Sequence, residues 1–214
     1  MYLGLRIDQS MMMSKYESTQ EFMYKDVEEL PESVDWRNNG SVTQVKRQGN
    51  CVEGIYQIKT GKNISLSEQE LIDCDTSYNL GCHGGDMDGA FTYIQTNGIS
   101  MENEYTYTEK NGTCKRNMTV SKIVNISGFR DVPVNDEESF MKALANQPVS
   151  VGIEGYGIDF QFYKGGVFNG SCGTQLDHAV TAIGYEKDYI TMKNSWGTGW
   201  GEWLYKDAKK HRET

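Results

Sequence analysis

Two residues in the second half of the chain have the types and the spacing of a catalytic base and its orienting partner. His178 lies in "LDHAVTAIGY", and Asn194 follows sixteen residues later in "KNSWGTGWGE". On neighbouring antiparallel strands the two side chains can meet, so that the amide oxygen accepts one imidazole N–H and fixes which ring nitrogen faces a nucleophile. Taken alone, a buried His–Asn pair is usually structural. The chain has only two other histidines, His83 and His211.

Capping signals and apolar periodicity predict three helices in the stretch before this pair. Residues 65–70 contain a capping box, a serine followed three residues later by a glutamate, ahead of an apolar run. Apolar residues from 87 to 94 recur at helical spacing, with Gly98 as the expected stop. The third helix is expected to begin at Asn135 as N-cap and to end before Pro148.

The chain changes from helical to strand composition at Val149. Short β-branched or aromatic stretches follow, separated by turns that contain glycine: "VSVGIE", "GGVFNG", "DHAVTAIGY" and "DYITMKNSW". The order of the elements, with helices in the first half of the chain and strands in the second, predicts an α+β protein of two lobes. A cleft between the lobes is then the expected site.

Charge and hydropathy exclude two classes of partner. The 30 acidic residues outnumber the 21 Lys and Arg, the formal net charge is -9, and the basic run at 206–212 is expected to be a solvated tail. A nucleic-acid binder would need a basic stripe to replace phosphate counterions. No apolar run reaches the length of a membrane helix, and residues 1–20 lack the features of a signal peptide. We therefore expect neither a nucleic-acid nor a membrane partner.

Cysteines and glycosylation sequons favour an oxidising compartment. The chain has five cysteines, so at least one thiol is left without an intramolecular disulfide partner. Six N-x-[ST] sequons occur, each of them weak alone but dense together. The sequons are at Asn39, Asn63, Asn111, Asn117, Asn125 and Asn169.

Five blocks in collinear order resemble the papain-like cysteine proteases, particularly the plant-type members. They are "LPESVDWRNNGSVTQVKRQGNC", "SLSEQELIDCD", "GCHGG", "LDHAV" and "KNSWGTGWG", and the resemblance covers residues 30–202. It implies a mainly helical lobe at 30–130, whose N-terminal strand crosses to the other lobe, and a β-barrel lobe at 131–214. Residues 1–29 would be the tail of a prosegment or a linker.

The resemblance also assigns roles to the His–Asn pair and its neighbours. His178 would be the general base and acid, Asn194 would orient it, and Trp196 would shield the pair from water. Gln48 would donate a side-chain N–H to the oxyanion hole, a contribution of about 3–4 kcal/mol to transition-state stabilisation.

Substrate contacts carried over from the family lie on both sides of the expected cleft. Gly84 and Gly85 would hold the peptide backbone, because the absence of Cβ permits close approach. The walls of the main specificity pocket would be Asp86, Met87, Gly152, Leu176 and Ala179. Asp86 departs from the usual apolar wall, so a basic or polar substrate residue would be tolerated there. Alternatively, Asp86 faces solvent or caps the following helix.

Family disulfides account for four of the cysteines. The resemblance implies the pairs Cys51–Cys82 and Cys74–Cys114, and leaves Cys172 unpaired because its partner's stretch is not recognisable. After Glu202 the family pattern stops, and the remaining residues do not resemble the expected strands, so the β-barrel lobe is expected to be truncated.

A zinc site formed by Cys74, Cys82 and His83 is the competing interpretation of these cysteines. Their spacing fits no common ligand pattern. We therefore expect no metal and no cofactor.

The family's nucleophile is missing from the place where it is expected. The family signature is C-G-[SA]-C-[WY], with the second cysteine attacking the substrate from a helix N-terminus. Here Cys51 follows Gln48 at the position of the first, disulfide-bonded cysteine, and Glu53-Gly54-Ile55 comes almost at once. Roughly eleven residues, about three helical turns, are absent. Either Cys51 replaces the nucleophile at the head of a shortened helix, or the nucleophile is gone.

The sequence therefore predicts a papain-family cysteine endopeptidase by descent that is inactive as written. The alternative is a non-catalytic homologue that binds peptides or prosegments. The expected partners are peptide or protein substrates, the chain's own prosegment and protein inhibitors of cysteine proteases. The chain is expected to be a monomer in an extracellular, lysosomal or vacuolar compartment. Loss of several buried apolar side chains, each worth about 1.5–3 kcal/mol, predicts low stability.

Overall fold

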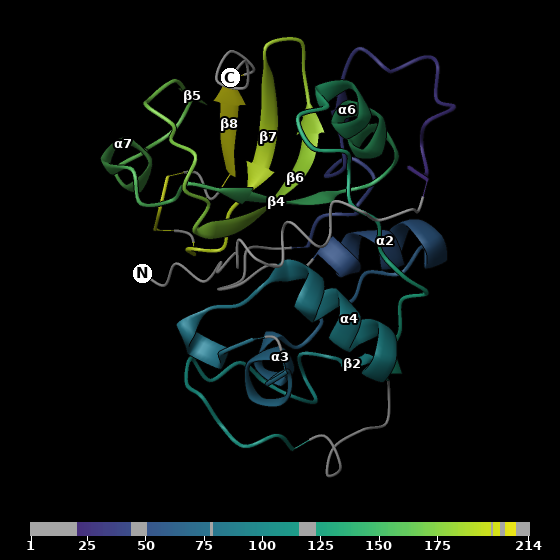
Figure 1. Cartoon of the computed structure of the whole chain (residues 1–214), viewed down its shortest axis with the longest axis vertical. Coiled ribbons are helices and arrows are strands. Elements are labelled where there is room, and N and C mark those ends of the chain that lie inside the picture. Colours follow the sequence, from purple (N-terminus) through teal and green to yellow (C-terminus); the bar gives the residue numbers. More distant parts are fainter. Residues whose placement is uncertain are drawn as a thin grey trace.

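The protein folds into two lobes, one built around a β-sheet and the other of helices (Figure 1). The structure is a computed structural model that describes residues 21–43, 51–77, 79–115, 123–197, 199–201 and 204–208. The sheet lobe lies above the helical lobe in Figure 1, with α2 between them. This arrangement confirms the α+β class of two lobes expected from the sequence (Figure 1). No helix among the described residues is long and apolar enough to cross a membrane.

The sheet has six strands, in the order β1–β6–β7–β8–β5, and β4 pairs with β6 off this path. All pairings are antiparallel except that of β5 with β8. The register of β4 against β6 places Gly152 opposite Ala179 and Ile153 opposite His178. The strands are β1 (Val34–Asp35), β4 (Val149–Ile153), β5 (Val167–Phe168), β6 (His178–Tyr185), β7 (Tyr189–Lys193) and β8 (Leu204–Ala208).

Strand β8 corrects the expectation that strand structure stops after Glu202. Its alternation sets Tyr205, which is 3% exposed, into the core, while the ammonium of Lys206 lies 4.4 Å from the centre of the Tyr189 ring. A strand buried on one face needs only alternate apolar residues. The charged residues Lys206 and Asp207, which lie on opposite faces of the strand, hid that pattern in the sequence.

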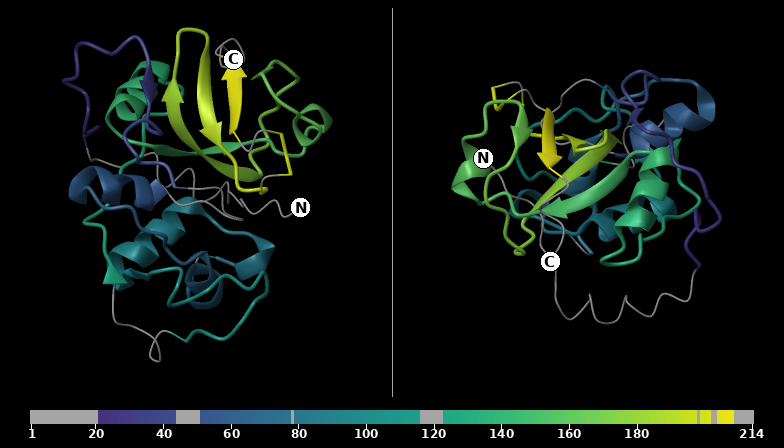
Figure 2. Two further views of the ribbon diagram at one scale, coloured as in Figure 1. Left: turned by 180° about the vertical axis from the view of Figure 1, so that it is seen from behind. Right: turned by 90° about the horizontal axis from the view of Figure 1, so that it is seen from above.

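Helices α6 (Glu137–Asn146) and α7 (Ile158–Gln161) belong to the sheet lobe, and α6 lies against one side of the sheet (Figure 2). The N-cap of α6 is Asp136 and not the predicted Asn135, because Asp136 accepts the backbone N–H of Ser139 at 2.9 Å. Asn135 instead has a φ of 57° and forms the turn before the helix. The helix ends before Pro148, as predicted.

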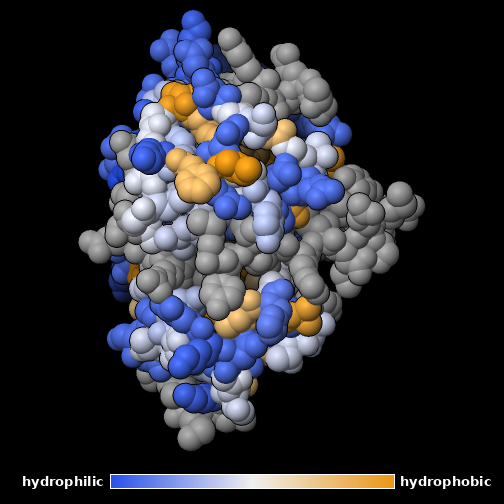
Figure 3. Space-filling view, turned by 90° about the vertical axis from the view of Figure 1, so that its left-hand side faces the viewer, coloured by the Kyte–Doolittle hydropathy of each residue, from blue (hydrophilic) through white to orange (hydrophobic). Residues whose placement is uncertain are grey.

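The short helix α7 presents apolar side chains on both sides. Phe160 is 3% exposed and packs in the core, whereas Ile158 and Phe162 are 75% and 73% exposed. Residues four apart share a helix face, so these two side chains project to solvent together. Hydrophobic residues are visible on this side of the sheet lobe in Figure 3.

The helical lobe confirms the predicted caps. Ser67 caps α3, its hydroxyl accepting the N–H of Glu70 at 3.0 Å. Asp86 caps α4, and Gly98, with a φ of 72°, ends it. The elements of this lobe are α2 (Cys51–Thr60), α3 (Glu68–Cys74), η1 (Gly81–His83), α4 (Met87–Asn97), β2 (Ile99–Ser100) and β3 (Ile123–Val124).

Each lobe has its own hydrophobic cluster, and α2 contributes to both. Leu144, Ala182 and Ile190 lie at the centre of the sheet-lobe cluster, against which Ile58 of α2 packs. Val52, near the start of α2, is 2% exposed and belongs to the helical-lobe cluster. The position of α2 therefore couples the two cores.

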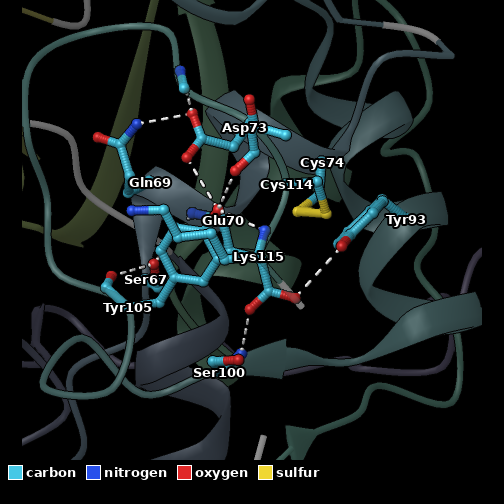
Figure 4. Close-up of a disulfide and its surroundings, with 12 residues drawn as sticks. Ser67, Gln69, Glu70, Asp73, Cys74, Tyr93, Ser100, Tyr105, Cys114 and Lys115 are labelled. Atoms are coloured by element: carbon cyan, nitrogen blue, oxygen red, sulfur yellow. Dashed lines mark hydrogen bonds between the residues drawn. A yellow bond between two sulfur atoms is a disulfide. The ribbon is translucent and has the colours of Figure 1, made fainter. Parts of the chain in front are cut away.

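A disulfide and a buried polar network fix α3 (Figure 4). Cys74, the last residue of α3, is bonded to Cys114. Nearby, the carboxylate of Asp73 accepts hydrogen bonds from Gln69 Nε2 at 2.9 Å, from Gly112 N at 2.7 Å and from Tyr105 Oη at 2.8 Å. Burial raises the pKa of Tyr105 to about 12, so its phenol keeps the proton that it donates. These contacts tie the 105–114 loop to the helix.

Candidate active-site cleft

His178 and Asn194 meet as the sequence suggested. His178 is the first residue of β6 and Asn194 follows the last residue of β7. His178 Nε2 lies 2.8 Å from Asn194 Oδ1, and the two side chains are 3% and 1% exposed. Because an amide oxygen can only accept, Nε2 carries the proton and Nδ1 is left as the basic nitrogen.

Trp196 covers this pair. Its ring stacks on the imidazole with centroids 4.6 Å apart and planes inclined by 25°. Burial lowers the pKa of His178, although the Asn194 hydrogen bond and the charge of Asp177 oppose the shift. The imidazole is therefore held neutral, as a base must be before it accepts a proton.

Two buried N–H donors beside His178 have no acceptor. Asn194 Nδ2 and Trp196 Nε1 are both inaccessible to solvent and unbonded among the described residues. Such donors usually cost about 1–3 kcal/mol each. The cleft is thus less completely satisfied than the network around Asp73.

A cavity of about 1130 Å³ opens between the lobes. The helical lobe contributes Gly84, Gly85 and the following two residues, and the sheet lobe contributes Gly152 and Leu176. A smaller, adjoining cavity of about 230 Å³ is lined by His178 and Ala179, and by the two glycines again. The structure thus brings together at these cavities the residues that the resemblance named: Gly84, Gly85, Asp86, Met87, Gly152, Leu176, Ala179 and His178.

Asp86 acts as a helix cap. One of its carboxylate oxygens accepts the N–H of Gly89 at 3.3 Å, while its own N–H bonds Asn79 Oδ1 at 2.6 Å. Of the interpretations of Asp86 offered by the sequence, the helix cap is the one that these hydrogen bonds support. Asp86 also lines both cavities.

Cys51 is the first residue of α2 and lines both cavities, the smaller one together with His178. A helix N-terminus favours a thiolate. Burial acts more strongly here and raises the pKa of Cys51 to about 11, although the hydrogen bond to the Ser150 side chain opposes this. No hydrogen bond joins the Cys51 sulfur to the His178 ring in the described part of the chain.

The expected disulfide between Cys51 and Cys82 is not formed, because both residues are free thiols. Helix α2 begins at Cys51 and places the thiol beside Ser150 of β4, whereas Cys82 lies in η1 of the helical lobe. Cys74–Cys114 is present, so Cys74 is not available as a zinc ligand. Cys172 is exposed.

The predicted donor to the oxyanion hole, Gln48, lies outside the described residues.

Three residues of the cleft were not predicted from the sequence. Ser150, in the middle of a strand, gave no signal in the sequence. Phe22 and Tyr24, from the stretch interpreted as a leader, line the larger cavity, and Tyr24 Oη donates to Gln147 Oε1 at 3.0 Å. In the sequence, only the aromatic side chains of these two residues indicated that they could line a cavity.

Comparisons with known proteins agree with this geometry. The family model described as papain family cysteine protease matches residues 30–214. Cysteine protease XCP2 of Arabidopsis thaliana is 51% identical over 227 residues, which cover 99% of this chain and 64% of that protein. The chain therefore spans less than two thirds of this relative's length.

Two solved structures have the same fold. The Carica candamarcensis cysteine protease CMS1MS2, crystallised with E-64, superposes with a TM-score of 0.80 at 43% identity, covering 84% of this chain and 89% of that one. The proform of Amb a 11, a major ragweed pollen allergen, gives a TM-score of 0.85 at 38% identity, with 95% and 69% covered.

Proposed function

The chain belongs to the papain family of cysteine proteases, and we propose that it descends from a peptide-bond hydrolase but no longer cleaves peptides. In this proposal His178 is the former general base, Asn194 its orienting partner, and Trp196 their cover. Gln48 is the former donor to the oxyanion hole. The reaction fails because no thiolate stands before the imidazole.

One observation carries the proposal: the surroundings of the Cys51 thiol, which is buried and bonded to Ser150. Burial raises the pKa of this thiol to about 11, which keeps the thiol protonated at neutral pH. Its hydrogen bond runs to Ser150 and not to His178. A nucleophilic cysteine needs a lowered pKa or an adjacent base. Cys51 therefore does not replace the lost nucleophile.

The length of the alignment gives independent support. The match to XCP2 extends over 227 residues, whereas this chain has only 214 in total. At least 13 aligned positions of XCP2 therefore have no residue here. A missing stretch of helical turns between Cys51 and Val52, with the nucleophile in it, is consistent with that difference.

Restoring the missing stretch tests the proposal. The segment that XCP2 has at this place is inserted between Cys51 and Val52, and a matched control carries serine at the position of the nucleophile. We expect the first chimera to react with E-64 and to hydrolyse a peptide substrate, and the serine control to do neither. Equal inactivity of two folded chimeras would contradict the proposal, because His178 and Asn194 would then be insufficient.

Peptide binding without cleavage is the second candidate function. It is favoured by the retention of both cleft walls, with Gly84 and Gly85 facing Gly152 and Leu176 across about 1130 Å³. In this case substrates, the chain's own prosegment and protein inhibitors of cysteine proteases would bind to the cleft. Titration with a prosegment peptide tests this: binding that is lost on Leu176→Arg, a change at an exposed side chain of the cavity wall, supports the function, and no binding to the unchanged chain rejects it.

The compartment belongs to the same proposal. We infer an extracellular, lysosomal or vacuolar location from the family and the sequons. Of the six, Asn39, Asn63, Asn111, Asn125 and Asn169 are exposed in the structure, and Asn117 lies outside the described residues. Mass spectrometry before and after removal of N-glycans from the natural protein tests the inference, and unmodified sequons would count against it.

A further inference from the structure

Two buried, oppositely charged side chains face each other from the two lobes. Glu53, in the first turn of α2, is 2% exposed, and Lys193, the last residue of β7, is 7% exposed. A buried charge is destabilising unless other groups bond and compensate it. Neither residue belongs to the His178–Asn194 pair, so the burial of the two charges must have another cause.

The hydroxyl of Thr43 connects the two charges. Lys193 Nζ donates to Thr43 Oγ1 at 3.1 Å, and Thr43 Oγ1 donates in turn to Glu53 Oε2 at 2.5 Å. A hydroxyl can accept one bond while it donates another, which is what a bridge from an ammonium to a carboxylate requires. Hydrogen bonds to ionised groups are the stronger kind.

The carboxylate of Glu53 is also fixed from its other side. Glu53 Oε1 accepts the backbone N–H of Leu66 at 2.8 Å, and Leu66 is fully buried. One turn along α2, Gln57 Oε1 accepts the hydroxyl of Ser41 at 2.5 Å. The segment 41–43 is therefore bonded to α2 twice, and the Thr43 contact leads on to the sheet lobe through Lys193.

The bridge ends next to the residue that orients the imidazole. Lys193 directly precedes Asn194, whose Oδ1 lies 2.8 Å from His178 Nε2. We propose that Lys193, Thr43 and Glu53 are positioning residues that hold the Asn194–His178 pair at a fixed place relative to α2. The geometry points to a coupling of the two cleft walls that does not depend on whether a nucleophile is present.

Thr43→Val tests this, because valine keeps the shape of threonine and removes the bridging hydroxyl. Ser41→Ala is the matched control, since it removes a hydroxyl from the same segment that bonds α2 but does not lead to Lys193. Thr43→Ser restores the hydroxyl as a rescue. The readout is the ¹H–¹⁵N resonance of the hydrogen-bonded Nε2–H of His178, which responds to the position of Asn194 Oδ1.

We expect Thr43→Val to shift this resonance by more than its linewidth or to abolish it, while the alanine and serine variants keep it. An unchanged His178 resonance in a folded Thr43→Val protein would overturn the inference. If the valine variant fails to fold, Lys193→Met gives the same test from the sheet side. A wild-type resonance in that variant would equally overturn it.

Discussion

The carboxylates beside Cys74 and the polar groups beside His178 show two opposite ways in which this chain treats buried polar groups. Around the Cys74–Cys114 disulfide, Asp73 accepts three hydrogen bonds, and Glu70 accepts one from Tyr93 and one from Ser100 (Figure 4). At the cleft, Asn194 Nδ2 and Trp196 Nε1 have no acceptor among the described residues.

The difference separates the network that maintains α3 from the cleft in which, under the proposed function, the chemistry took place. Buried carboxylates that accept several hydrogen bonds specify one conformation, whereas unsatisfied buried donors occur where a ligand or a reacting group is expected. The His178–Asn194 pair and both cavity walls are present. Under the proposed function, what the cleft lacks is a reactive thiol beside them.

The largest effect should follow from opening the disulfide. Changing Cys74 and Cys114 together to serine removes a cross-link between residues 40 apart, so we expect a loss of about 4 kcal/mol in the free energy of unfolding. Urea denaturation measures it, with Cys172→Ser as the control for losing an exposed thiol. A loss no larger than that of the control would show that the disulfide does not stabilise the lobe.

Removing the carboxylate at the centre of the network should cost somewhat less. Asp73→Ala leaves three donors without their acceptor, and we expect a loss of about 3 kcal/mol. Asp26→Ala, at an exposed carboxylate, should change stability by less than about 0.5 kcal/mol. Equal denaturation midpoints for the two variants would contradict the contrast drawn above.

Shortening the side chains of Cys51 and Val52, the first two residues of α2, should lower the free energy of unfolding by different amounts. Val52→Ala removes methyl groups from a 2%-exposed side chain, and we expect a loss of about 2 kcal/mol. Cys51→Ala removes a single sulfur atom from a half-buried side chain at the cavity wall, and should cost less than about 1 kcal/mol. Thermal and urea unfolding compare the pair, and the reverse order would mean that Cys51 belongs to the core.

The smallest effect concerns pH. Because burial lowers the pKa of His178 in the folded protein, the unfolded chain binds a proton that the folded one does not. Stability should therefore fall as the pH drops below the unfolded pKa of about 6.5, with a slope of at most about 1.4 kcal/mol per pH unit. Below the pKa of His178 in the folded protein, both states bind the proton and stability no longer changes with pH through this group.

His178→Gln checks that contribution. The difference in stability between wild type and variant, followed by urea denaturation from about pH 7.5 to about pH 5.5, should change with pH in the direction stated. Parallel curves for the two proteins would show that His178 titrates alike in both states.

The sequence predicted local features whose cause is local. The Ser67 cap, the Gly98 stop and the strand that begins at His178 are specified by neighbouring residues, and the structure has them. The cap of α6 was predicted one residue too early, because Asn135 and Asp136 have similar capping ability and only the left-handed φ of Asn135 distinguishes them.

Features that depend on three-dimensional packing escaped prediction. Whether Cys51 pairs with Cys82 depends on where the head of α2 lies relative to β4, and the bond to Ser150 joins residues far apart in the chain. The bridge from Lys193 through Thr43 to Glu53 likewise spans both lobes. Strand β8 was hidden because two adjacent residues, Lys206 and Asp207, are charged.

The central claim is that this chain has a base but no nucleophile, and active-site labelling tests it most directly. The folded protein, mildly reduced, is incubated with E-64, and the intact mass and a peptide map are recorded. We predict no adduct at Cys51, since its thiol is protonated and bonded to Ser150, and no hydrolysis of a peptide substrate. A single adduct on Cys51, formed together with measurable hydrolysis that His178→Gln abolishes, would contradict the account.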